Sequence, residues 1–192
     1  TNLDLTPTVR DLRLFKGENT AAADDKWRTV LVGGYRQGGY GYYALNVTDP
    51  ENPEMLWEIT QASDDVDTLT DPHDYENLGL TYGSPFLGTA FIPNPDLAGG
   101  PALGEVSVTI FPGGLHPEEP VASTTDLYVV TTLTGRLIKK LSPRFPGSYA
   151  CAGNCAAKPE CCAQLITSPV GYGAIPGLVT TRVFVGDDRG RI

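Results

Sequence analysis

Short runs rich in Val, Ile, Leu, Thr, Tyr and Phe alternate along the chain with clusters of Gly, Pro, Asn and Asp. Such runs predict β-strands, because β-branched and aromatic side chains suit a pleated surface, whereas the other residues favour turns. No segment has the apolar spacing of a convincing helix. The predicted strands cover residues 28–33, 42–48, 55–60, 81–91, 106–111, 127–132, 136–141, 165–170 and 182–186.

The chain also contains an internal repeat. Ser84-Pro85 recurs as Ser168-Pro169, "VVTTLTGRL" at 129–137 aligns with "FVGDDRGRI" at 184–192, and "VLVGG" at 30–34 resembles "VFVGD" at 183–187. Repeated units of strand, loop, strand and hairpin predict the blades of a β-propeller, in which each four-stranded sheet buries its faces only against its neighbours. An ordinary β-sandwich, whose strands have similar spacing, is the alternative.

The repeat occurs about two and a half times, whereas a propeller has roughly 4–8 blades. We therefore expect an all-β partial β-propeller with quinoprotein-like, four-stranded blades and long loop insertions, within a longer polypeptide. Residues 1–27 are interpreted as a lead-in segment and residues 28–192 as the incomplete propeller. Its blade parts are expected at about 28–60, 79–141 and 165–192.

The chain is acidic, with 14 Lys and Arg residues against 23 Asp and Glu and a formal net charge of −9. No basic run of the kind that neutralises phosphates is present, so neither nucleic acid nor an anionic lipid surface is an expected partner. No stretch approaches the roughly 20 consecutive apolar residues of a membrane-spanning helix. The first residues lack the features of a signal peptide.

Three stretches carry a family resemblance: "LVGGYRQGGYGYYALNVTDPENPEMLWEIT" at 31–60, "GLTYGSPFLG" at 79–88 and "VFVGDDRGRI" at 183–192. In this order they resemble the C-terminal propeller of the PilC/PilY family, proteins associated with the tip and assembly of bacterial type IV pili. The resemblance implies an extracellular protein of the bacterial cell surface or pilus tip that supports pilus assembly and adhesion and is not an enzyme. Its implied partners are pilin or minor pilins, a surface or host ligand, and other parts of its own longer chain.

Calcium is the cofactor that this resemblance brings into question. Many family members carry an Asp-rich calcium loop before the last of these stretches, but residues 171–182 contain no carboxylate here, so that site is not carried over. The acidic stretch 63–77 begins like a calcium loop, yet Leu69 and Thr70 stand where a ligand and a turn glycine belong. We interpret it as a solvated insertion, with weak calcium binding as the alternative, and expect no other cofactor. The candidate ligands are Asp64, Asp65, Asp67 and Asp71.

Four cysteines lie within one predicted loop, "CAGNCAAKPECC", at Cys151, Cys155, Cys161 and Cys162. Such density suggests disulfides formed in an oxidising compartment. Zinc fits poorly, because an adjacent pair does not supply the usual paired, short-spaced ligands. Bonds from Cys151 and Cys155 across to the 161–162 pair are favoured, since a bond within that pair must join Cα atoms only about 3.8 Å apart.

A vicinal disulfide would nevertheless suggest a rival function, because quinoprotein alcohol dehydrogenases place one against their quinone. "TLTGRLIKKL" at 132–141 is faintly similar to their blade motif, but Leu141 stands where a tryptophan should close it, and Trp27 and Trp57 lie elsewhere. A glycan-binding propeller is a further alternative. No Ser-His-Asp order, phosphate loop or catalytic carboxylate pair is evident.

The remaining polar residues are assigned structural roles. His73 and His116 are isolated loop residues, most often surface ones. Asp187 and Asp188 are expected to cap a turn. The tyrosines at 35, 40, 42 and 43 are expected to pack over glycine backbone, with a sticky aromatic surface as the alternative. Binding is expected in the loops 61–78, 92–104, 112–125 and 142–164.

Overall fold

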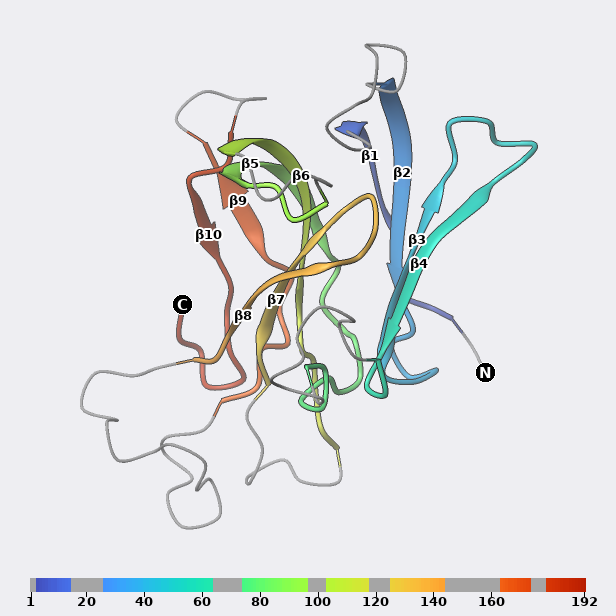
Figure 1. Ribbon diagram of the computed structural model, residues 1–192. Coiled ribbons are helices and arrows are strands. Elements are labelled where there is room, and N and C mark those ends of the chain that lie inside the picture. Colours follow the sequence, from blue (N-terminus) through green and yellow to red (C-terminus); the bar gives the residue numbers. More distant parts are fainter. Residues whose placement is uncertain are drawn as a thin grey trace.

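The computed structural model describes residues 3–14, 26–63, 74–96, 103–117, 125–143, 163–173 and 179–192. Within these ranges every regular element is a strand (Figure 1). The strands are β1 (Thr8–Leu14), β2 (Lys26–Gly34), β3 (Gly41–Asn46), β4 (Glu54–Thr60), β5 (Phe86–Pro93), β6 (Leu103–Pro112), β7 (Leu127–Thr131), β8 (Leu137–Leu141), β9 (Val170–Tyr172) and β10 (Arg182–Phe184).

The strands form three antiparallel sheets in chain order. Blade 1 has the order β1-β2-β3-β4, blade 2 has the order β5-β6-β7-β8, and blade 3 is the pair β9 and β10. Figure 1 shows the three sheets side by side, with blade 2 between the other two. This succession is that of a partial β-propeller and confirms the predicted fold class, whereas a sandwich would close with two facing layers.

Several predicted strand boundaries were wrong. The sequence analysis assigned no strand to the first 27 residues, but β1 lies there and pairs with β2 along its whole length. The strand predicted over 81–91 begins only at Phe86, and the one predicted over 165–170 begins at Val170. The residues before them are extended links that make only isolated bridges, Leu80 to Leu115 and Leu165 to Asp187. Strands β5 and β9 begin directly after Pro85 and Pro169, because proline has no N–H to donate to a sheet ladder.

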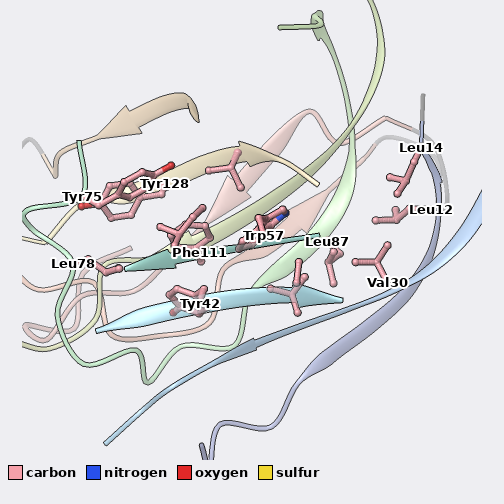
Figure 2. Close-up of a cluster of buried hydrophobic side chains, with 14 residues drawn as sticks. Leu12, Leu14, Val30, Tyr42, Trp57, Tyr75, Leu78, Leu87, Phe111 and Tyr128 are labelled. Atoms are coloured by element: carbon pink, nitrogen blue, oxygen red, sulfur yellow. The ribbon is translucent and has the colours of Figure 1, made fainter. Parts of the chain in front are cut away.

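Two apolar layers hold the blades together, and we call the contact surface between neighbouring blades a seam. The first seam, between blades 1 and 2, contains Leu12, Leu14, Val30, Val32, Tyr42, Ala44, Trp57, Ile59, Tyr75, Leu78, Leu87, Phe111, Tyr128 and Val130 (Figure 2). The second seam, between blades 2 and 3, contains Val106, Val108, Ile110, Leu127 and Leu165, with Phe86, Val183 and Val185 packed against them. Blade 2 is therefore covered on both faces.

Candidate interaction interface

The first strand of each blade begins directly after a Ser-Pro or Thr-Pro dipeptide. These are Thr6-Pro7 before β1, Ser84-Pro85 before β5 and Ser168-Pro169 before β9. The Ser84 hydroxyl donates to the Thr6 carbonyl at 3.3 Å, and the Ser84 N–H donates to the Ser168 hydroxyl at 2.9 Å. In both seams, the hydroxyl of the later blade thus bonds the main chain of the equivalent residue in the earlier blade. The sequence repeat revealed only the second and third dipeptides.

Side chains of β1 also bond the main chain of blade 2. The Thr8 hydroxyl donates to the Pro85 carbonyl at 2.8 Å, and the Arg10 guanidinium donates to the carbonyl of Leu87. In the other direction, the Ser107 hydroxyl donates to the Arg13 carbonyl at 2.8 Å. These bonds give main-chain carbonyls of both blades a hydrogen-bond donor across the seam, and they fix β1 against β5 and β6.

Trp57 closes the outer part of the first seam. Its indole packs on Gly135 in the β7–β8 turn, and its Nε1 donates to the Thr132 carbonyl at 2.9 Å. Gly135 has a φ of +73°, and a Cβ there would lie 2.7 Å from Trp57 Cγ. Trp57 of blade 1 therefore packs across the seam against the turn of the "TLTGRLIKKL" hairpin in blade 2.

The second seam depends on Phe86 and two glycines. A Cβ added at Gly171 would lie 2.1 Å from Phe86 Cζ, and one at Gly88 would lie 2.6 Å from Phe86 Cε1. The ring therefore occupies the space that side chains at both positions would need. Val183 and Val185 complete the contact from β10 and the residue following it.

Tyr42 anchors the glycine-rich β2–β3 hairpin in the first seam. Its ring centroid lies 4.5 Å from that of Phe111, and its hydroxyl donates to the Gly83 carbonyl at 2.8 Å. Burial raises the pKa of Tyr42 well above its ordinary value, so the phenol stays neutral. On the other face of β3, Tyr43 lies over Gly33, as expected for tyrosines in a glycine-rich strand pair.

Thr81 holds the loop of that hairpin. Its hydroxyl accepts the N–H groups of Tyr35 and Arg36 at 2.9 and 3.0 Å and donates to the Gly41 carbonyl at 3.0 Å. Arg36 has a φ of +53°, which is uncommon outside glycine. The link before blade 2 thus stabilises a strained turn of blade 1.

Asp187 organises the "GDDRGR" turn, as predicted. Its Oδ1 accepts the N–H groups of Arg189 and Arg191 at 2.9 and 2.8 Å, and its Oδ2 accepts Arg191 Nε at 2.7 Å. Burial raises the pKa of the Asp187 carboxyl, but the hydrogen bonds from Arg191 and Arg189 outweigh burial, so this pKa lies below its ordinary value. Asp188, which was predicted to cap the same turn, instead bonds the preceding link: its Oδ1 accepts the Gln164 N–H and its N–H donates to the Gln164 carbonyl, each at 3.0 Å.

A buried polar group that the sequence did not reveal lies where the link before β5 meets β7. Asp126, 1% exposed, accepts a hydrogen bond from Asn77 Nδ2 at 3.0 Å. The neighbouring Tyr128 hydroxyl is buried, with no hydrogen-bond partner among the described residues. Burial, and secondarily the charge of Asp126, raises the pKa of Tyr128 far above its ordinary value. This phenol therefore offers no proton near neutral pH.

Most predicted site residues lie outside the described residues: Cys151, Cys155, Cys161, Cys162, Asp64, Asp65, Asp67, Asp71 and His73. His116 is described, and it is partly buried, with Nε2 3.3 Å from the Asn77 carbonyl and its ring facing Tyr40. In the described parts of the chain, no three His, Cys, Asp or Glu residues are placed to hold a metal ion. No helix there is long and apolar enough to cross a membrane.

No protein-family model matches the chain. A PilY1 homologue of Xylella fastidiosa, a type IV pilus biogenesis factor, is 30% identical over 127 residues, which is 65% of this chain and 7% of that protein. The Pseudomonas aeruginosa (UCBPP-PA14) type IV pilus biogenesis factor PilY1 is 34% identical over 83 residues, 43% of this chain and 5% of that protein. The crystal structure of the P. aeruginosa PilY1 C-terminal domain matches with a TM-score of 0.62 and 22% identity, covering 96% of this chain and 28% of that one.

Three stacked sheets joined by hydroxyl and tryptophan contacts define the chain as a partial β-propeller of the kind found in a type IV pilus biogenesis factor. In sequence and fold the chain is similar to PilY1 proteins, which are named type IV pilus biogenesis factors. The chain spans only 7% of the length of the first of these relatives.

Proposed function

We propose that the chain is part of a surface-exposed protein of the type IV pilus tip, where it supports pilus assembly and adhesion without catalysing a reaction. The observation that carries this proposal is the 30% identity over 127 residues with a type IV pilus biogenesis factor. The seams support it, because side chains and main chain interlock across them and give a stiff scaffold that can hold binding loops under load.

The proposed partners, pilin or minor pilins and a surface or host ligand, would contact the connections between strands. Since adjacent strands are antiparallel, the β4–β5, β6–β7 and β8–β9 connections leave from the same end of the stack. The acidic stretch 63–77 and the four cysteines belong to these connections. We place the main contact surface at this end of the stack.

The test is to delete the gene in its bacterium and restore it with wild-type or altered copies. Surface pili are counted by shearing and immunoblotting, and attachment to surfaces or host cells is measured separately at matched pilus number. The proposal expects few surface pili without the gene. It also expects weaker attachment, at normal pilus number, when residues 118–124 of the loop 112–125 are replaced by a short Gly-Ser loop, which spares the described residues on either side. Normal piliation in the deletion strain would overturn the proposal.

Two measurements on the purified protein check the proposed location and the absence of catalysis. Reduction is expected to add the mass of four hydrogen atoms, one for each cysteine, because both disulfides would form outside the cytoplasm. The visible spectrum is expected to show no quinone band, and the protein is expected to reduce no electron-accepting dye. A bound quinone would favour the dehydrogenase alternative instead.

A further inference from the structure

The outer strands of blades 1 and 2, β4 and β8, belong to hairpins of opposite charge. Among the described strands, each of the two pairs with a neighbour on one side only. The hairpin of β3 and β4, residues 41–60, has no Lys or Arg, and its carboxylates are Asp49, Glu51, Glu54 and Glu58. The hairpin of β7 and β8, residues 127–141, has no Asp or Glu, and its cations are Arg136, Lys139 and Lys140. We call them the acidic hairpin and the basic hairpin.

This separation of charge differs from that of a surface that only has to stay soluble, where both signs are interspersed. The four carboxylate residues and Lys139 are exposed, and Arg136 and Lys140 are half-buried. The basic hairpin holds three of the 14 Lys and Arg residues in a chain whose formal net charge is −9. Cations gathered in this way favour contact with an acidic surface.

The outermost charges of the two hairpins cannot neutralise each other within one chain. Glu58 lies opposite Tyr43, on the face of blade 1 that is turned away from blade 2. Lys139 lies opposite Val129, which packs in the second seam, on the face of blade 2 that is turned away from blade 1. Because the two side chains leave their sheets in opposite directions, an ion pair between such groups requires a second molecule.

Both outer strands contain a β-bulge, in which Leu56 and Ile138 have no partner in the strand register. A bulge interrupts the row of main-chain groups at a sheet edge and so opposes the addition of another strand. Contact at these edges is therefore expected through side chains. Met55 on β4 and Leu141 on β8 are 61% and 44% exposed and supply apolar area beside the charges.

We propose that the two hairpins form the contact of a homodimer, in which the acidic hairpin of each copy packs against the basic hairpin of the other. The occupant is a second copy because both complementary surfaces lie on neighbouring blades of this one chain. A two-fold axis running between β4 and β8 brings the hairpins together twice, and such a contact closes with two copies. The inference concerns association of the whole polypeptide and does not depend on the proposed role in the pilus.

Analytical ultracentrifugation of the polypeptide as its gene encodes it tests the dimer over a range of protein concentrations. A monomer–dimer equilibrium is expected that weakens as sodium chloride is raised, because the contact depends on exposed charges. A protein that stays monomeric at every concentration would overturn the proposal. It would do so even if the protein bound polyglutamate, since that result would assign the basic hairpin to a different, acidic partner.

Charge reversals in the same gene-encoded protein locate the contact. Lys139→Glu and Glu54→Lys are each expected to raise the dimer dissociation constant about tenfold, since each sets like charges against each other at both contacts. Arg182→Glu, which changes an exposed cation of β10 and alters the net charge as much as Lys139→Glu does, is the matched control and should leave the constant unchanged.

An equal mixture of the Lys139→Glu and Glu54→Lys proteins is expected to form dimers again, because two acidic hairpins then meet two basic ones. Thermal midpoints equal to that of the wild type show that both variants are folded. An effect of Arg182→Glu as large as that of Lys139→Glu would contradict the proposal, and so would a mixture that stays monomeric.

Discussion

Gly135 combines two constraints, a left-handed backbone and a crowded side-chain position, as Gly114 does where the segment after β6 meets the link before blade 2. The Gly135 φ of +73° disfavours side chains, and a Cβ would meet the Trp57 indole 2.7 Å away. Gly135→Ala is therefore expected to lower the free energy of unfolding by about 2–3 kcal/mol, the sum of left-handed backbone strain and overpacking. Urea unfolding followed by tryptophan fluorescence measures this loss.

Two other glycines separate the constraints. Gly190 has a φ of +75° with no atom within 4 Å of an added Cβ, so Gly190→Ala should cost only about 1–2 kcal/mol, the backbone strain. Gly104 has the same open space and no positive φ, so Gly104→Ala should change stability by less than about 0.5 kcal/mol. If Gly135→Ala cost no more than Gly190→Ala, the contact with Trp57 would not contribute.

Asp187 makes the stability of the C-terminal turn depend on pH. Its pKa in the folded protein lies below its ordinary value, so the folded state favours the charged carboxylate. The stabilisation is fully present above the unfolded pKa of about 3.9 and is lost as the pH falls through the folded pKa. Asp187→Asn is therefore expected to be less stable than wild type at pH 7, and the difference should shrink below about pH 4. Thermal midpoints from pH 7 to pH 2 measure this difference, and parallel curves would refute the assignment.

The role of Trp57 shows what sequence reasoning misses at this scale. The sequence repeat predicted the turn at Gly135. The tryptophan that closes the related blade motif was expected near Leu141, in the same blade as this turn. Its partner Thr132 lies 75 residues further along the chain, so the contact exists only once two sheets stack. The cap at Asp187, by contrast, involves residues two and four positions away and could be predicted from local turn chemistry.

Strand β1 was the element hardest to predict. Its sequence "TVRDLRL" places charged residues between the apolar ones, and Arg10 lies on the same side of the strand as the buried Leu12 and Leu14. Arg10 tolerates that side because its guanidinium reaches the Leu87 carbonyl in blade 2. The strands of blades 1 and 2 with uninterrupted apolar runs, such as β2 and β7, could be predicted to within a few residues.

The alternation along β1 has a measurable consequence. In the 192-residue chain, Leu12→Ala should lower the free energy of unfolding by about 2–4 kcal/mol, because Leu12 is 3% exposed in the first seam. Val9→Ala, at an exposed site three residues earlier, should cost less than about 1 kcal/mol. Urea midpoints of the two variants decide the point; equal losses would mean that the two faces of β1 are not distinct.

At the scale of the whole molecule, coverage differs between the sheets. Blade 2 has a seam on each face, whereas the two-stranded blade 3 has one. Amides of β6 and β7 are therefore expected to exchange with solvent deuterium more slowly than those of β9 and β10. Hydrogen exchange followed by mass spectrometry of peptides gives both rates, and similar rates would indicate that the three sheets open together.

The stacked arrangement itself could be predicted, because repeated units that bury their faces only against one another require it. The number of strands in each sheet and the identity of the seam residues could not, since these depend on pairings between segments far apart in the sequence. The cysteines and the acidic stretch, which stood out most in the sequence, lie outside the described residues. The described sheets are held together by the apolar residues of the two seams, with hydroxyl bonds and close fits of aromatic rings to glycines between them.

The fit of Phe86 to Gly171 bears on how such a protein can grow in evolution. In the second seam, the large Phe86 of the earlier blade faces Gly171 of the later blade. In the first seam, the corresponding residues are the smaller Thr8 of the earlier blade and the larger Leu87 of the later blade. Tandem duplication of the gene segment for blade 2 would set Phe86 of one copy against Leu87 of the next, with no glycine to receive the ring. A duplicated blade 2 would therefore need a compensating change at one of these two positions, either a smaller residue for Phe86 or a glycine for Leu87.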